Sequence, residues 1–232
     1  MKRAPLTAFL LSFCLVFILS SSAIAQEMNN YMAIKAGVYD PTGDLDDAEF
    51  DTGFNGEVAF GRYVIPNLAV ELGVGYWQTE ASYGGVFVDP TLGVVTFSED
   101  DEVQVIPITL TVKGVLPADM FELYLGGGIG WYFASYDTDA WMSGTVMDTP
   151  FRGSISFDDD DNVFGGHVVA GALINFSERF FFGVEGKYIW TAEAEASGTA
   201  QVIVDSTFVP VPIHMEGDLN GYTVTGVLGV KF

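Results

Sequence analysis

The chain ends on Gly221-Tyr-Thr-Val-Thr-Gly-Val-Leu-Gly-Val-Lys-Phe232, where large apolar residues alternate with small or polar ones. Successive side chains of a strand point to opposite faces, so one face of this stretch is apolar and the other is small or polar. The apolar face carries Tyr222, Val224, Gly226, Leu228, Val230 and Phe232. The stretch predicts an amphipathic β-strand that ends on an aromatic residue. Any edge strand could end this way, so its meaning depends on the rest of the chain.

The opposite end of the chain has the three parts of a secretory signal peptide. Met1-Lys-Arg3 is basic, Leu6 to Leu19 is apolar, and Ala23-Ile-Ala25 is a small-residue cleavage site. The alternative is an uncleaved membrane anchor. Cys14, the one cysteine, lies inside this segment after Phe13, where a lipoprotein cleavage box has a small residue. We expect residues 1–25 to be a secretory signal peptide and residues 26–232 to be one exported domain without disulfides.

The composition leaves two fold classes for the exported domain. The whole chain is 49% hydrophobic and 17% charged, yet no later segment has the roughly 18 uninterrupted apolar residues of a spanning helix. A soluble all-β domain or a barrel with apolar and polar residues interleaved along each strand can have this composition.

Eight segments of the exported domain read as strands joined by alternating short and long connections. The strands are expected at 31–39, 53–63, 68–77, 103–116, 122–133, 163–174, 180–190 and 221–232. The short turns are expected at 65–67, 117–119 and 176–179, and the long connections at 40–51, 78–102, 136–162 and 192–218. The long connections hold 24 of the 31 acids, whereas a soluble sandwich has no reason to collect polar loops at one end. The pattern predicts an all-β, eight-stranded antiparallel up-and-down transmembrane β-barrel with long acidic extracellular loops. We expect a monomer with both termini in the periplasm.

Three stretches, 60–76, 106–113 and 123–133, resemble small outer-membrane barrels related to OmpA and OmpW. The last strand resembles the closing strand of that family, in which the terminal aromatic residue and its neighbours are read by the β-barrel assembly machinery. The resemblance implies an outer-membrane location among lipid and lipopolysaccharide, with Tyr222, Val230 and Phe232 as the assembly signal. In contrast to full-length OmpA, we expect no peptidoglycan-binding domain after the barrel.

The inward faces of the predicted strands carry three acids and three bases: Lys35, Glu57, Glu71, Lys113, Glu185 and Lys187. Charges inside a narrow barrel must be paired or hydrated, because an isolated buried charge is very costly. An eight-stranded barrel is only just wide enough for its own side chains. We expect a network that plugs the lumen; the alternative is a gated path for ions or small solutes.

Aromatic residues gather near both ends of the predicted strands, as in the interfacial girdles of membrane barrels. Those near the outer ends are Tyr76, Trp131, Tyr188, Trp190 and Tyr222, and those near the inner ends are Phe60, Phe121, Phe180, Phe182 and Phe232. Beyond the outer ends, alternation returns at 86–97 and 201–213 around Asp89 and Asp205. These segments predict β-hairpins that extend the wall; the alternative is additional membrane strands, giving ten or twelve.

Two acidic runs, Asp44-Leu-Asp-Asp47 and Asp158-Asp-Asp-Asp161, could hold Ca²⁺ or Mg²⁺ weakly. Neither has the ordered ligand spacing of an EF-hand, so a solvated charge run is the competing interpretation. His167 and His214 are the only histidines, and no nucleophile and base pair is recognisable from spacing. We predict no enzyme, no cofactor and no nucleic-acid partner.

Two functions remain open at the level of the sequence. The first is a structural or passive channel-like barrel for small or hydrophobic solutes, which the resemblance to OmpW suggests. The second is a surface recognition or adhesion protein that acts through its acidic loops. A packed, charge-paired lumen favours the second for polar solutes, because a continuous aqueous pore needs a wider barrel. The apolar content of the loop hairpins favours the first for hydrophobic solutes, because an apolar extracellular vestibule could lead a solute sideways into the lipid. We expect the structural or channel-like role, with surface recognition as the alternative.

Overall fold

The computed structural model describes residues 29–89, 93–146, 149–204 and 207–232 and contains a closed ring of eight antiparallel strands. The ring runs in the order β1, β10, β7, β6, β5, β4, β3, β2. Its members are β1 (Asn30–Pro41), β2 (Gly53–Ile65), β3 (Leu68–Asp89), β4 (Gly93–Ala118), β5 (Phe121–Val146), β6 (Thr149–Asn175), β7 (Phe180–Thr191) and β10 (Gly221–Lys231). The predicted eight-stranded up-and-down barrel is confirmed.

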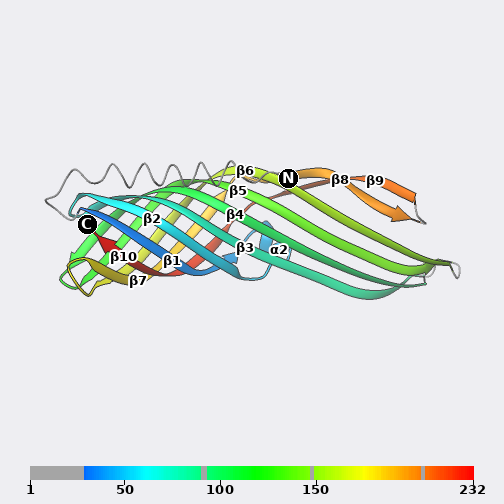
Figure 1. Cartoon of the computed structure of the whole chain (residues 1–232), viewed down its shortest axis with the longest axis horizontal. Helices are drawn as coiled ribbons and strands as arrows, with labels where there is room; N and C mark the ends of the chain where they lie inside the picture. The colour runs from blue at the N-terminus through cyan, green and yellow to red at the C-terminus, as the bar shows by residue number, and fades with distance from the viewer. Residues whose placement is uncertain (1–28, 90–92, 147–148, 205–206) are drawn as a thin grey trace.

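The C-terminal strand closes the ring against the first strand. β1 and β10 pair from Tyr31↔Lys231 to Pro41↔Gly221, and Phe232 exchanges backbone hydrogen bonds with Asn30 in both directions, at 3.1 and 2.8 Å. A closed ring leaves no unpaired strand edge inside a bilayer, where water cannot satisfy backbone groups. The terminus lies at the same end of the barrel as the short turns (Figure 1).

Side chains alternate across the barrel wall as the sequence predicts. Along β10, Thr223, Thr225 and Val227 are buried in the lumen, while Tyr222, Val224 and Leu228 are exposed on the outside. The outer surface is therefore apolar, with half or more of the Leu125, Val184 and Leu228 side chains exposed. Such a surface belongs in lipid, not in water.

Two of the predicted long loops are strands instead. β3 to β6 have 22, 26, 26 and 27 residues, and their pairing continues to Asp89↔Gly93 and Val146↔Thr149. These four strands leave the ring as one long twisted sheet (Figure 1), which we call the extended wall: residues 79–89, 93–103, 135–146 and 149–162. The predicted hairpin at 86–97 is confirmed. The prediction of a loop at 136–162 is wrong. The ladder of backbone hydrogen bonds does not depend on the side chains. Acidic residues therefore do not interrupt a strand whose side chains face water.

The other two long connections also contain regular structure. β8 (Ala194–Val204) and β9 (Thr207–Gly217) form a separate two-stranded hairpin, so this predicted hairpin is confirmed, and among the described residues the ring has no strands beyond its eight. The first connection holds α2 (Asp44–Asp47), a single turn that was not predicted. Its Leu45 is buried at the mouth of the barrel. No helix in the described part of the chain is long and apolar enough to cross a membrane.

Candidate functional site: the lumen and the extended wall

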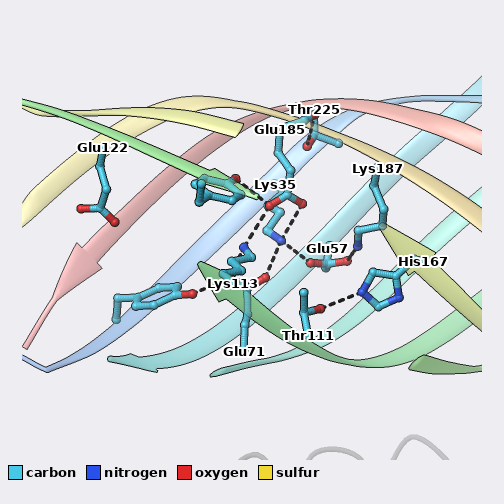
Figure 2. A network of polar contacts seen from close by, with 12 residues as sticks. Lys35, Glu57, Glu71, Thr111, Lys113, Glu122, His167, Glu185, Lys187 and Thr225 are labelled. Carbon is cyan, nitrogen blue, oxygen red and sulfur yellow. Dashed lines mark hydrogen bonds and ion pairs between the residues drawn. The ribbon is translucent and has the colours of Figure 1, made fainter. Parts of the chain in front are cut away.

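The six predicted lumen charges meet in one buried network at the middle of the barrel (Figure 2). Lys35 Nζ lies at its centre and donates to Glu57 Oε1 at 2.6 Å, Glu71 Oε1 at 2.8 Å and Glu185 Oε1 at 2.9 Å. These carboxylates come from β2, β3 and β7, so one ammonium group ties four strands together across the lumen. Of these three carboxylates, only Glu57 lies directly opposite Lys35 in the strand register.

The remaining two lysines occupy the second oxygens of the same three carboxylates. Lys113 Nζ donates to Glu71 Oε2 at 2.7 Å and Glu185 Oε2 at 3.0 Å, and Lys187 Nζ donates to Glu57 Oε2. Each carboxylate therefore contacts two ammonium groups, and the three positive charges balance the three negative ones. A buried charge that loses its partner is strongly destabilising, by roughly 3–5 kcal/mol.

Two tyrosines outside the six predicted charges complete the network. Tyr31 Oη donates to Glu71 Oε2 and Tyr124 Oη to Glu185 Oε2, both at 2.7 Å. Lys113 Nζ also lies 4.5 Å from the centre of the Tyr124 ring. The period-2 pattern gives the faces of these residues, but not which carboxylate each ring reaches.

An apolar layer fills the lumen between the ionic network and the extended wall. Tyr39 and Trp77 stack with ring centroids 3.9 Å apart, and both are fully buried. They pack with Tyr132 and with Leu45 from α2 in one cluster. This layer closes the barrel on the side of the long connections.

A second set of aromatic and charged residues fills the lumen near the short turns. Tyr31, Tyr124 and Phe181 belong to one buried cluster there. Glu122 lies apart from the central network (Figure 2) and accepts hydrogen bonds from Lys231 Nζ at 2.9 Å and from Tyr63 Oη. Lys231 and Glu122 were not among the six predicted lumen charges. The hollow among these side chains measures about 20 Å³, which is space for about one water molecule.

The tertiary structure brings together a histidine and a hydroxyl group that the sequence spacing did not indicate as a pair. His167 Nε2 lies 2.8 Å from Thr111 Oγ1. Both side chains are buried inside the barrel, with His167 fully enclosed, so no substrate has access to this pair. His214 belongs to β9, and its side chain lies outside the described residues.

The acidic runs are not brought together as metal sites. Asp158, Asp159, Asp160 and Asp161 follow one another along β6, so their side chains point alternately to the two faces of the wall. Asp161 Oδ2 instead accepts a hydrogen bond from the backbone of Glu195 at 2.9 Å. Among the described residues, no group of three or more His, Cys, Asp or Glu side chains could hold a metal ion.

The outward aromatic residues lie at the strand positions that the sequence indicated. Trp131, Trp190, Tyr222, Phe121, Phe180, Phe182 and Phe232 are exposed on the outside of the ring. Tyr222 contacts Tyr188 with centroids 4.7 Å apart, and Phe232 lies 6.1 Å from Phe60. Phe232 and Tyr222 thus mark the two ends of the closing strand, although their reading by the assembly machinery stays a prediction.

A closed ring of amphipathic strands with an apolar exterior defines the class of outer-membrane β-barrel proteins. The chain belongs to the family of the outer membrane protein beta-barrel domain, which it matches over residues 11–232. This family places the protein in the outer membrane. The predicted signal peptide lies outside the described residues and stays a prediction.

The chain is similar to solved structures of outer-membrane proteins at low sequence identity. A major outer membrane protein from Thermus thermophilus has 15% identity and a TM-score of 0.51, covering 88% of this chain and 98% of that chain. OprG from Pseudomonas aeruginosa has 12% identity and a TM-score of 0.51, covering 88% and 96%. The outer membrane protease OmpT from Escherichia coli has 11% identity and a TM-score of 0.47, covering 88% and 97%. No curated protein sequence matches the chain significantly.

Proposed function

We propose that the barrel is a non-conducting membrane anchor and that the extended wall it carries is a recognition surface. The observation that supports this is the filling of the lumen at three levels: the Tyr39 and Trp77 layer, the Lys35 network and the Glu122 cluster. An ion would have to displace side chains that are already paired, and an eight-stranded ring has no room beside them. The elements left free to act are those beyond the ring.

A passive route for hydrophobic solutes is the second candidate. The inner face of the extended wall is partly apolar, with Phe87 and Met142 exposed. A solute there is separated from the lumen by the buried Tyr39 and Trp77 layer, so it would have to leave sideways into lipid. The same enclosure argues against an enzyme, because the Thr111 and His167 pair lies behind that layer.

Planar-bilayer recordings of the refolded protein test the closed barrel. We expect no discrete conductance from the wild type, because no continuous aqueous path crosses the three levels. Lys113→Ala and Glu71→Ala remove opposite sides of one buried ion pair, and Glu178→Gln, an exposed acid in a short turn, is the matched control. Discrete wild-type conductance that the two lumen variants change and Glu178→Gln leaves alone would refute the anchor role.

A further inference from the structure

The inner face of the extended wall has an apolar hollow far from the membrane ring. Its volume is about 330 Å³. The inner-face residues that line it come from all four strands of the wall: Phe87, Val95, Phe97, Glu99, Ala140, Met142 and Gly153. This face continues the lumen face of the barrel, because the alternation of β3 to β6 runs unbroken through the wall.

Small residues on neighbouring strands leave room between the large ones. Met142 pairs directly with Phe97, and the small residues Ala140, which pairs with Glu99, and Gly153, which pairs with Met142, leave space beside it. Phe87 and Phe97 pack with centroids 6.1 Å apart. Phe87 remains 47% exposed and Met142 44% exposed. Large apolar side chains that stay this accessible beside a hollow are typical of a binding surface.

Carboxylates border the same hollow. Glu99 lines it, and Asp101 follows two residues along β4 on the same face. Burial, and then Asp101, raise the pKa of the Glu99 carboxyl. Burial is also the first cause that raises the pKa of Asp101, and Oδ1 of that side chain is buried without a hydrogen-bond partner. A cation brought to this border would satisfy both groups.

The surrounding sequence supplies almost no positive charge. Residues 78–102 and 136–162 contain thirteen acids, and Arg152 is their one base. The potential over the wall is therefore negative, which repels anionic ligands and attracts cationic ones. Apolar contact and negative charge together select a ligand that has both apolar and basic groups.

We propose that this hollow binds a cationic amphipathic peptide segment of a partner protein. Apolar side chains of the segment lie against Phe87, Phe97 and Met142, and its lysine or arginine side chains lie beside Glu99 and Asp101. The proposal rests on the recognition role of the wall and names the chemistry of the partner.

The alternation of β4 supplies a matched set of variants for the test. Glu99→Gln with Asp101→Asn removes two charges from the hollow face, and Asp100→Asn with Glu102→Gln removes two charges from the opposite face of the same strand segment. Net charge is identical in the two double variants. Met142→Ser removes apolar contact at an exposed position.

The measurement is fluorescence anisotropy of labelled peptides with the refolded protein in nanodiscs of zwitterionic phosphatidylcholine. The probe is a short peptide of alternating lysine and leucine, compared with lysine–serine and glutamate–leucine peptides of equal length. We expect only the lysine–leucine peptide to bind well. Its Kd should rise about fivefold or more in the Glu99 and Asp101 double variant and in Met142→Ser, and change less than about twofold in the Asp100 and Glu102 double variant.

Four results would overturn the proposal: absent binding of the lysine–leucine peptide, equal loss in both double variants, equal binding of the lysine–serine peptide, or better binding of the glutamate–leucine peptide. Equal loss would mean attraction by net charge alone. Better binding of the glutamate–leucine peptide would assign the hollow to a different ligand class. The bilayer recordings are independent of these outcomes. If the protein shows no conductance and does not discriminate among the peptides, only the proposed ligand class is contradicted. If the protein conducts ions, the anchor role is contradicted.

Discussion

Three lumen glycines decide where aromatic side chains can lie. Gly61, Gly171 and Gly229 each pair in register with an aromatic residue of the next strand, namely Tyr31, Tyr124 and Phe181. A Cβ atom at these glycines would lie 2.0, 2.2 and 2.1 Å from atoms of those rings. The missing side chain lets each ring lie across the neighbouring strand. For Tyr31 and Tyr124 this position brings the hydroxyl to a network carboxylate.

Gly229→Ala should destabilise the barrel, and Gly226→Ala in the same strand should not. The added methyl group at 229 collides with the Phe181 ring, and overpacking of this kind costs about 1–3 kcal/mol. At the outward Gly226, the nearest atom to an added Cβ is the Ala36 carbonyl oxygen at 3.8 Å, so the change should stay within about 0.5 kcal/mol. Urea unfolding in lipid vesicles, followed by tryptophan fluorescence, compares the two midpoints. Equal midpoints would contradict the packing role of Gly229.

At the scale of elements, the extended wall holds carboxylates close together on its outer face. On the outer face, Glu80, Glu102, Asp137 and Asp158 are directly opposed from β3 to β6. On the inner face, Asp101 lies opposite Ala81 and Thr138. Like charges directly opposed across strands are destabilising. Backbone hydrogen bonds therefore keep the four strands of the wall paired despite the repulsion among its carboxylates.

Asp101→Asn should stabilise the wall at neutral pH. Burial, and to a lesser extent Asp100, raise the pKa of Asp101, while a hydrogen bond from Thr138 opposes this shift. Because the folded pKa is raised, the ionised form destabilises the wall at pH above the folded pKa. That penalty disappears as pH falls through the folded pKa and is absent below the unfolded value of about 3.9.

Hydrogen exchange at residues 98–103 and 136–141 checks this prediction. At about pH 7, exchange should be slower in Asp101→Asn than in the wild type, and the difference should shrink towards about pH 4. Asp119→Asn, in the turn between β4 and β5 at the opposite end of the barrel, is the control. A difference that persists unchanged at low pH, or that Asp119→Asn reproduces, would contradict the charge explanation.

The whole molecule has two unlike ends. Short turns and the C-terminus lie at one end, and the extended wall and the β8–β9 hairpin lie at the other, with α2 between them at the mouth of the ring (Figure 1). The exposed apolar ring surface lies between them. This asymmetry fits a barrel that keeps its short turns in the periplasm and carries its long elements outside the cell.

We predict that the extended wall faces the exterior of intact cells. A cysteine in place of Thr145, exposed in the wall, should react with a membrane-impermeant maleimide on intact cells. A cysteine in place of Ser177, exposed in a short turn, should react only after permeabilisation. Protease on intact cells should cut only within 40–51, 78–102, 136–162 or 192–218. Labelling at 177, or cleavage at Pro117 or Ser177, would invert the topology.

The sequence by itself determined the ring and the faces of its strands. Alternation along stretches such as 221–232 has a period of two whatever the neighbours are, so it placed Lys35, Glu71 and Glu185 inward before any pairing was known. The short turns were equally readable, because turn residues interrupt the pattern there. These features depend on local order along the chain.

Only the tertiary structure decided which side chains meet and how far the strands continue. The predicted loop at 136–162 contains acids, but residues 136–146 and 149–162 form strands because partner strands on both sides satisfy the backbone. The three contacts of Lys35 join residues up to 150 positions apart, and ring closure brings those residues together. The hollow beside Glu99 likewise needs four strands in register. Strand pairing and ring closure are long-range, and a period along one strand carries no information about its partner.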